Sequence, residues 1–137
     1  MVHFSGHASS WGVLLEDEAG TQDGTDLDYG LLARALGATD EPPRLVVLNA
    51  CESLDGADDL LQTVPAVIGM SDTITDLAAV TFAARFYAAV ASAQSVATAV
   101  EQAKTAMQMA SLDDSELPQI RTREDVDPAR LVLVNPA

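Results

Sequence analysis

Apolar residues in this chain gather in short continuous runs that predict β-strands. The most continuous run covers residues 45–48 and reads Leu-Val-Val-Leu. Such a run fits a strand that is buried on both faces, as in the centre of a parallel sheet. Residues 66–70 predict a second buried strand, entered at a proline. Residues 1–4, 11–15 and 131–134 predict three more strands, and we expect strand 1–4 to pair with strand 45–48.

Between these runs, apolar residues recur at the spacing of amphipathic helices. The first helix is expected to be capped by Thr25 or Asp26 and to end at Gly37. A short helix is expected over residues 54–62, and two long helices follow. The stripes expected to face the core are Leu27, Leu31, Leu32, Ala35 and Leu36 in the first helix; Ala57, Leu60 and Leu61 in the short one; Leu77, Val80, Ala84, Tyr87 and Val90, flanked by Phe82 and Phe86, in the helix over residues 76–91; and Val96, Ala99, Val100, Ala103 and Met107 in the helix capped by Ser95.

Strands and helices therefore alternate along the chain. Alternation of this kind predicts the α/β class, with a mostly parallel sheet flanked by helices. A chain of 137 residues can bury a sizeable core, so residues 1–137 are interpreted as a single domain. Residues 16–24 are expected to form a surface loop, and residues 111–128 are acidic and expected to be irregular.

The charge balance narrows the classes of partner. The formal net charge of −14 at pH 7 argues against binding to nucleic acid or to an anionic membrane surface. The single cysteine cannot form an internal disulfide, which favours a reducing compartment. The first residues lack the basic and apolar segments of a signal peptide, so a cytoplasmic protein is expected. Neither a Gly-rich phosphate loop nor a metal-ligand spacing is present, so no cofactor and no metal are expected.

Two residues with catalytic chemistry follow predicted strands. His7 stands just past strand 1–4, and Cys51 stands just past strand 45–48. Reacting groups in open α/β sheets gather at the carboxyl ends of the strands. A thiol becomes a strong nucleophile as the thiolate, and a nearby imidazole can accept its proton. If the two strands are adjacent and parallel, His7 and Cys51 meet at one edge of the sheet and can form a catalytic dyad.

Five other polar or aromatic residues are interpreted as structural. His3 precedes the histidine loop on a strand and is expected to have a packing role. Trp11 is expected to pack in the core or against its loop, and Asn49 is expected to hydrogen-bond within the loop that follows it. Tyr29 and Tyr87 are expected to be half-buried on their helices.

Three segments of the sequence, HFSGHAS, LNACES and AVIGMSDTITDLAAVTFAARFY, resemble in order and spacing the CHAT domain, a caspase-like peptidase domain related to separase. The resemblance runs from Val2 to about Met109 and extends to the last predicted strand. It implies a caspase-like α/β fold. A domain of this kind normally carries two further strand and helix units before the histidine strand, so this chain is expected to correspond to the carboxyl-terminal portion of the domain.

The resemblance also implies roles for individual residues. His7 and Cys51 would form the catalytic dyad, and the backbone N–H groups of Cys51 and Ala8 would stabilise the oxyanion of the acyl-transfer step. The family usually has glycine after the histidine, where this chain has Ala8. Alanine keeps the N–H donor, but its methyl group can narrow the site and restricts the backbone conformations that glycine permits.

The implied function is a cysteine endopeptidase that cleaves a protein target in the cytoplasm, under the control of fused or neighbouring sensor or repeat domains in prokaryotic defence. The alternative is an inactive interaction or regulatory module that keeps the fold. In the active case, the loop over residues 69–76 is expected to line the pocket for the residue before the scissile bond. Asp76, and secondly Asp72, would bind an Arg or Lys there. The alternative for Asp76 is that it caps the following helix.

Overall fold

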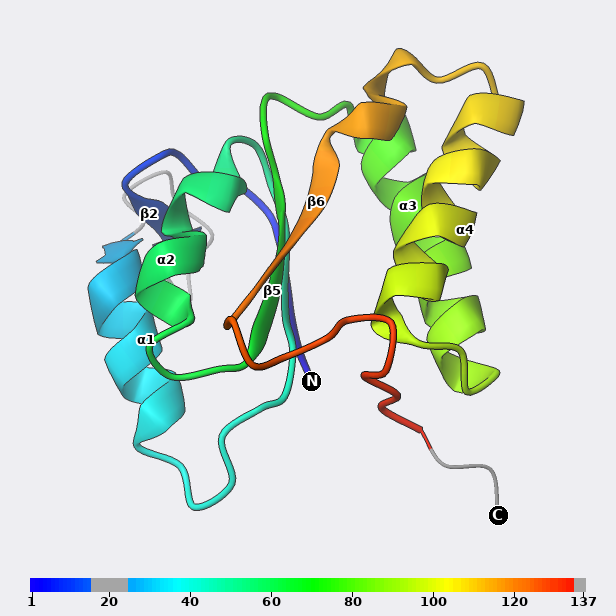
Figure 1. The fold of residues 1–137 in the computed structure, drawn as a ribbon. Coiled ribbons are helices and arrows are strands. Elements are labelled where there is room, and N and C mark those ends of the chain that lie inside the picture. Colours follow the sequence, from blue (N-terminus) through cyan, green and yellow to red (C-terminus); the bar gives the residue numbers. More distant parts are fainter. Residues whose placement is uncertain (16–24, 135–137) are drawn as a thin grey trace.

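The computed structural model describes residues 1–15 and 25–134. A four-stranded sheet with strand order β1-β4-β5-β6 forms the centre. Helices α1 and α2 cover one face of the sheet, and α3 and α4 cover the other (Figure 1). Strands β1 (Val2–Ser5), β4 (Val46–Asn49) and β5 (Ala66–Met70) run parallel, and β6 (Pro118–Thr122) runs antiparallel to β5. The mostly parallel α/β architecture predicted from the sequence is confirmed.

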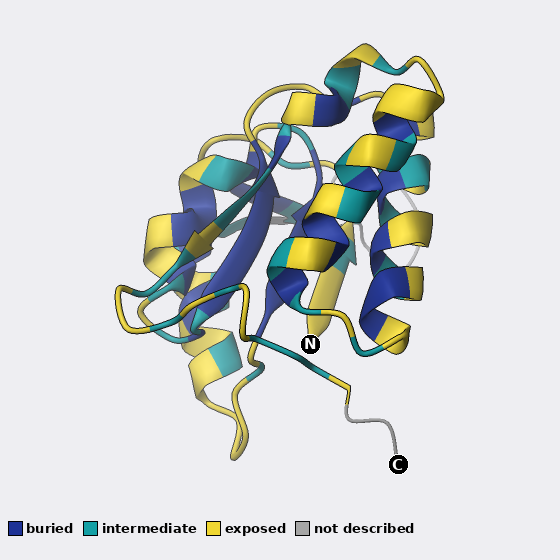
Figure 2. Cartoon of the chain, turned by 45° about the vertical axis from the view of Figure 1, so that its right-hand side comes forward, coloured by how far each residue is buried: buried dark blue, intermediate teal, exposed yellow. Residues whose placement is uncertain are grey.

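Strands β4 and β5 lie at the centre of the core because both of their faces are covered. Every residue of both strands is buried, as the continuous apolar runs predicted (Figure 2). Side chains alternate across the sheet. Leu45 and Val47 pack with α3 and α4, whereas Val46 and Leu48 pack in the cluster formed with α1 and α2. The helices on both faces of the sheet therefore pack against the same two strands, β4 and β5.

Helices α3 (Asp76–Ala91) and α4 (Val96–Met109) form a hairpin on one face of the sheet. Each begins at a hydroxyl N-cap, because the side chains of Thr75 and Ser95 accept hydrogen bonds from the first turn of their helices. The core stripe predicted for α4 is buried. No helix within the described residues is long and apolar enough to cross a membrane.

The core stripe predicted for α3 is wrong at three positions, because Leu77, Val80 and Ala84 are exposed. Leu77 and Val80 are 64% and 66% exposed. The residues that α3 buries are Ala78, Phe82, Phe86, Ala89 and Val90. This helix is apolar on nearly all sides, so the spacing of apolar residues does not select an inner face. The inner face is the one that carries Phe82 and Phe86. Their rings stack with centroids 5.4 Å apart and are fully buried in the core between α3, α4 and the sheet.

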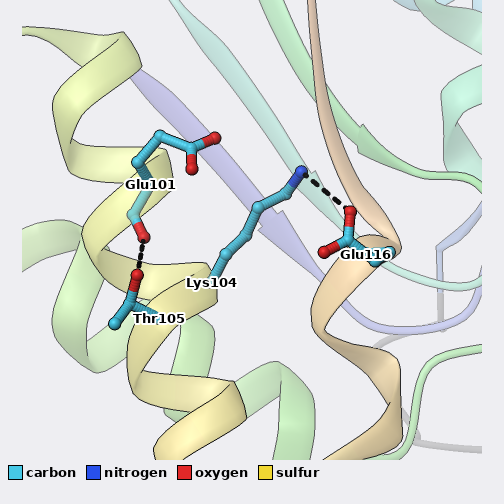
Figure 3. A network of polar contacts seen from close by, with 4 residues as sticks. All are labelled: Glu101, Lys104, Thr105 and Glu116. Carbon is cyan, nitrogen blue, oxygen red and sulfur yellow. Dashed lines mark hydrogen bonds and ion pairs between the residues drawn. The ribbon is translucent and has the colours of Figure 1, made fainter.

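The segment after α4 also differs from the prediction. Residues 111–128 were expected to be irregular, but they contain the 3₁₀ helix η2 (Asp113–Glu116) and the whole of β6. The acidic composition of the segment did not indicate either element. Residues 131–134 form no strand. Instead, the carbonyl of Leu131 accepts the N–H of Val96 at the start of α4, which leaves this backbone outside the sheet. Lys104 of α4 reaches Glu116 of η2 at 4.0 Å (Figure 3), and because the Glu116 carboxylate is exposed, this long contact adds little stability.

A small hairpin stands beside the sheet on the α1 side. It consists of β2 (Gly12–Leu15) and β3 (Thr25–Asp28), and the predicted loop between them lies outside the described residues. The first helix, α1 (Tyr29–Gly37), is capped by Asp28 and not by Thr25 or Asp26, because those two residues belong to β3. The short helix expected over residues 54–62 is observed as η1 (Ser53–Gly56) followed by α2 (Ala57–Leu60).

Strand β1 lies at an edge of the sheet, with β4 on one side and no other described strand on its outer side. Exposed edges with unpaired backbone groups favour pairing with another chain. We expect the 137-residue chain to be marginally stable or to self-associate through β1. Val2→Lys, which places a charge on this edge, should reduce self-association measured by analytical ultracentrifugation. Val134→Lys, at a similarly exposed valine outside the sheet, serves as the control. A wild-type chain that stays monomeric and melts cooperatively at high concentration would contradict the prediction.

Candidate functional site

The carboxyl ends of the three parallel strands meet at one edge of the sheet, at the top of the molecule in Figure 1. Strands β1 and β4 are paired in register, with Ser5 opposite Asn49. His7 and Cys51 each follow two residues after this pair. The topology therefore brings the two loops that carry His7 and Cys51 to the same edge on neighbouring strands, as the hypothesis of a dyad requires.

Cys51 is half-buried at the rim of the core formed with α3 and α4. Its Sγ lies 3.7 Å from the carbonyl oxygen of Ile74, in the loop between β5 and α3. A carbonyl accepts a hydrogen bond only from the protonated thiol. In this contact the thiol is the donor and the carbonyl of Ile74 is the acceptor.

The loop that carries His7 is held as a hairpin. The carbonyl of His7 accepts the N–H of Leu14, and the N–H of Ser9 donates to the carbonyl of Gly12, both at 2.9 Å. The hydroxyl of Tyr29 donates to the carbonyl of Ser9 at 2.8 Å and ties the hairpin to α1. The imidazole of His7 is exposed and borders a hollow of about 180 Å³. No hydrogen bond joins His7 to Cys51, so their action as a dyad stays a prediction.

Tyr29 is fully buried, not half-buried as predicted. Burial raises its pKa to about 12, with further contributions from the negative charges of Asp55 and Glu52. The phenol therefore stays protonated near neutral pH and remains a donor to the histidine loop.

The two predicted oxyanion donors are both free within the described part of the chain. Ala8 forms a bridge with Val13, and the backbone hydrogen bonds of this bridge come from the residues on either side. In such a pair the N–H of Ala8 points away from β2. The N–H of Cys51 likewise has no acceptor among the described residues. Their role as oxyanion donors stays a prediction.

The turn after Cys51 contains two residues that sequence reasoning missed. Glu52 adopts a left-handed backbone conformation (φ 56°), and its N–H donates to the carbonyl of Asp72 at 3.1 Å. Ser53 is completely buried and hydrogen-bonds both β4 and β5. The sequence places a serine four residues after the end of β4, which is the one signal that could have indicated its role. The pattern does not show which groups its hydroxyl contacts.

The prediction that Asn49 hydrogen-bonds within the loop that follows it is wrong. The side-chain amide of Asn49 donates to the carbonyl of Ala79 in α3 at 2.9 Å, because the alternation along β4 directs residue 49 toward that helix. The side chain is buried, and its carbonyl oxygen has no hydrogen-bond partner among the described residues. Asn49 therefore anchors the end of β4 to α3, two residues before Cys51.

The two carboxylates predicted to bind substrate both lie at this edge and are exposed. Asp72 accepts the N–H of Thr73 at 2.7 Å. Asp76 is the first residue of α3, but Thr75 is its N-cap, so the alternative role of Asp76 as the cap is wrong. The loops over residues 6–11, 50–56 and 71–76 contain no Lys or Arg, so this edge is acidic.

Two residues expected to be structural have different outcomes. His3 contacts half-buried Tyr87 of α3 through a hydrogen bond and an edge-on ring contact, which confirms its structural role. Burial lowers the pKa of His3 and raises the pKa of Tyr87 to about 12, so the hydrogen bond joins a neutral imidazole and a protonated phenol near neutral pH. Trp11 is 57% exposed at the tip of the histidine hairpin, so its predicted packing role is wrong.

The described residues contain no group of three or more His, Cys, Asp or Glu side chains that could hold a metal ion. A search of curated proteins found no match to the chain. The chain matches a protein-family model, that of the CHAT domain, over residues 1–129. Because this match spans nearly the whole of the 137 residues, and the sheet has the arrangement expected of a caspase-like fold, the chain belongs to the CHAT domain family.

Proposed function

We propose that the chain is a cysteine endopeptidase of caspase-like type, with Cys51 as the nucleophile and His7 as the general base. The observation that carries the proposal is the pairing of β1 with β4, which sets the two residues at equivalent positions beyond the pair Ser5 and Asn49. Family membership supports it independently. The free N–H groups of Ala8 and Cys51 supply the remaining requirement of acyl transfer, a pair of donors for the oxyanion.

The proposed reaction uses groups of this chain alone. His7 accepts the proton of the Cys51 thiol, and the thiolate attacks the carbonyl carbon of the scissile peptide bond. The N–H groups of Ala8 and Cys51 hold the resulting oxyanion. His7 returns its proton to the leaving amine as the C–N bond breaks, which leaves a thioester on Cys51. Water then gives a proton to His7 and attacks the thioester, the C–S bond breaks, and the departing thiolate takes the proton back.

The proposed substrate is a protein segment cleaved after Arg or Lys. The acidic edge favours a basic chain by its field, and a carboxylate can bind arginine through two parallel charge-assisted hydrogen bonds. Asp76 is the first candidate because Thr75 fulfils the capping role and Asp76 makes no hydrogen bond to another described residue. Asp72 is the second candidate. Control by a sensor or repeat domain, cytoplasmic location and a role in prokaryotic defence belong to the same proposal.

The direct test is labelling with a peptidyl acyloxymethyl ketone that carries arginine at its reacting end. The proposal requires covalent labelling, and mapping of the modified peptide must place the label on Cys51. The second candidate function, an inactive interaction module, is favoured by the contact of the Cys51 thiol with Ile74 and by alanine at position 8. An absence of labelling at any pH or probe concentration, for a folded protein, would select this second function.

Removal of the Asp76 charge should weaken the selection of arginine. We expect Asp76→Asn to lower kcat/KM for an Arg peptide by about 10–100-fold, the loss that follows from a charged hydrogen bond. Stability should change little because the cap at Thr75 remains. Asp125→Asn is the matched control, since Asp125 is exposed in the segment that bonds the start of β5 at the opposite end of the sheet. Unchanged kinetics with Arg peptides, or cleavage after Asp, would exclude the assignment.

A further inference from the structure

Ser53 occupies an unusual place between the two central strands. The parallel ladder of β4 and β5 pairs Val46 with Val67 and Val47 with Ile68, and then stops. If the ladder continued in register, the N–H of Met70 would donate directly to the carbonyl of Leu48. The hydroxyl of Ser53 stands in this bond instead: it donates to the carbonyl of Leu48 at 2.8 Å and accepts the N–H of Met70 at 3.0 Å. The strands are thus joined through a side chain.

The position is built to receive this side chain. Ser53 is 0% exposed, and both of its hydrogen-bond partners are backbone groups of buried residues. Gly69 lies directly behind it: a Cβ at residue 69 would stand 2.7 Å from the Cα of Leu54, a distance that real structures do not show. Glycine therefore permits the close approach of the segment over residues 53–54 to β5, and the serine hydroxyl fills the opening between the strands.

Cys51 lies in the short turn that this arrangement closes. The chain leaves β4 at Asn49 and returns to the end of the same strand at Ser53. Between them, Glu52 adopts its left-handed conformation and donates its N–H to Asp72. Ser53 thus holds the end of the turn to β5, and Glu52 holds it to the loop that follows β5. The N–H of Cys51 in this turn has no acceptor within residues 1–15 and 25–134.

We propose that Ser53 is a positioning residue of this site, which holds the strands apart and thereby directs the Cys51 N–H toward the substrate oxyanion. The inference rests on the proposed peptidase function. Without the hydroxyl, Leu48 and Met70 can pair directly only if the turn over residues 50–52 shifts. Such a shift turns the peptide group that carries the oxyanion donor, whereas the thiol of Cys51 stays within reach of a small alkylating reagent.

The test separates acyl transfer from simple alkylation of the thiol. Alkylation of Cys51 by iodoacetamide requires the thiolate but no oxyanion donor, whereas peptide hydrolysis requires both. We expect Ser53→Ala to lower kcat for an Arg peptide by about 10–100-fold, as expected for a misplacement on the scale of 1 Å. KM and the pH profile of alkylation should not change. Ser53→Thr, which keeps the hydroxyl, should recover activity.

Ser115→Ala is the matched control, because Ser115 is also a buried serine but lies in η2. The proposal is overturned if Ser53→Ala leaves kcat unchanged, or if it lowers hydrolysis and alkylation in parallel with its melting temperature. Amide hydrogen exchange gives a readout that does not need turnover: faster exchange at Glu52 in folded Ser53→Ala supports the positioning role, and unchanged exchange excludes it. A wild-type protein that does not hydrolyse peptides refutes the proposed function, and the exchange result still decides the role of Ser53.

Discussion

Replacement of Cys51 by alanine is expected to abolish peptide hydrolysis and covalent labelling. The thiol is the only group at this edge that can form the acyl intermediate in the proposed reaction, so the rate should fall by at least about 10⁴-fold. His7→Ala should cost about 10²–10⁴-fold, the usual range for loss of a general base. Both residues lie in loops beyond the strands and outside the buried core, so neither change should unfold the protein. Rates with an Arg peptide, together with thermal melts, measure both effects.

The second histidine of the chain is a natural control. His3 lies four residues before His7 on β1, and its ring contacts Tyr87 of α3. His3→Ala should therefore leave the rate of hydrolysis unchanged even if the melting temperature falls. Two results would contradict the proposal. One is an equal loss of activity in His3→Ala and His7→Ala, and the other is wild-type activity in Cys51→Ala.

The largest effect on stability is expected from Phe82 on the inner side of α3. Phe82→Ala removes a fully buried ring that stacks on Phe86, and the cavity left behind should cost about 3–5 kcal/mol. For a chain of this length, that loss corresponds to a fall in Tm of roughly 10–20 °C. Urea denaturation, with the slope held constant, gives the free energy of unfolding directly.

Leu77→Ala on the same helix is the control for this experiment. Leu77 is one of the residues that the apolar periodicity predicted for the core, yet its side chain is largely exposed. Its removal should change the free energy of unfolding by no more than about 0.5 kcal/mol. The reverse ranking, with Leu77→Ala more destabilising than Phe82→Ala, would mean that α3 packs by the face that the sequence pattern first suggested.

Local patterns were reliable where the residues themselves limit the structure. An uninterrupted apolar run has one stable environment, a strand covered on both faces, and both β4 and β5 have it. The predicted N-cap Ser95 is also local, since its side chain bonds the first turn of its own helix. Patterns failed where two solutions satisfy them equally. The apolar sides of α3 are one case, and the serine, proline and glutamine residues around β6 are another, because that strand is defined by its pairing with β5.

The sequence alone was sufficient to predict the buried parallel strands, the positions of His7 and Cys51 beyond two strand ends, and the resemblance to the CHAT domain. These features depend on residue type and short-range spacing. The predicted pairing of β1 with β4 is likewise confirmed. Only the tertiary structure could decide the bond from Asn49 to α3 and the insertion of Ser53 between β4 and β5. The bond from Asn49 to Ala79 and the bond from Met70 to Ser53 join groups that are 30 and 17 residues apart. The energy of such contacts depends on burial and direction in the folded chain, which no local pattern records.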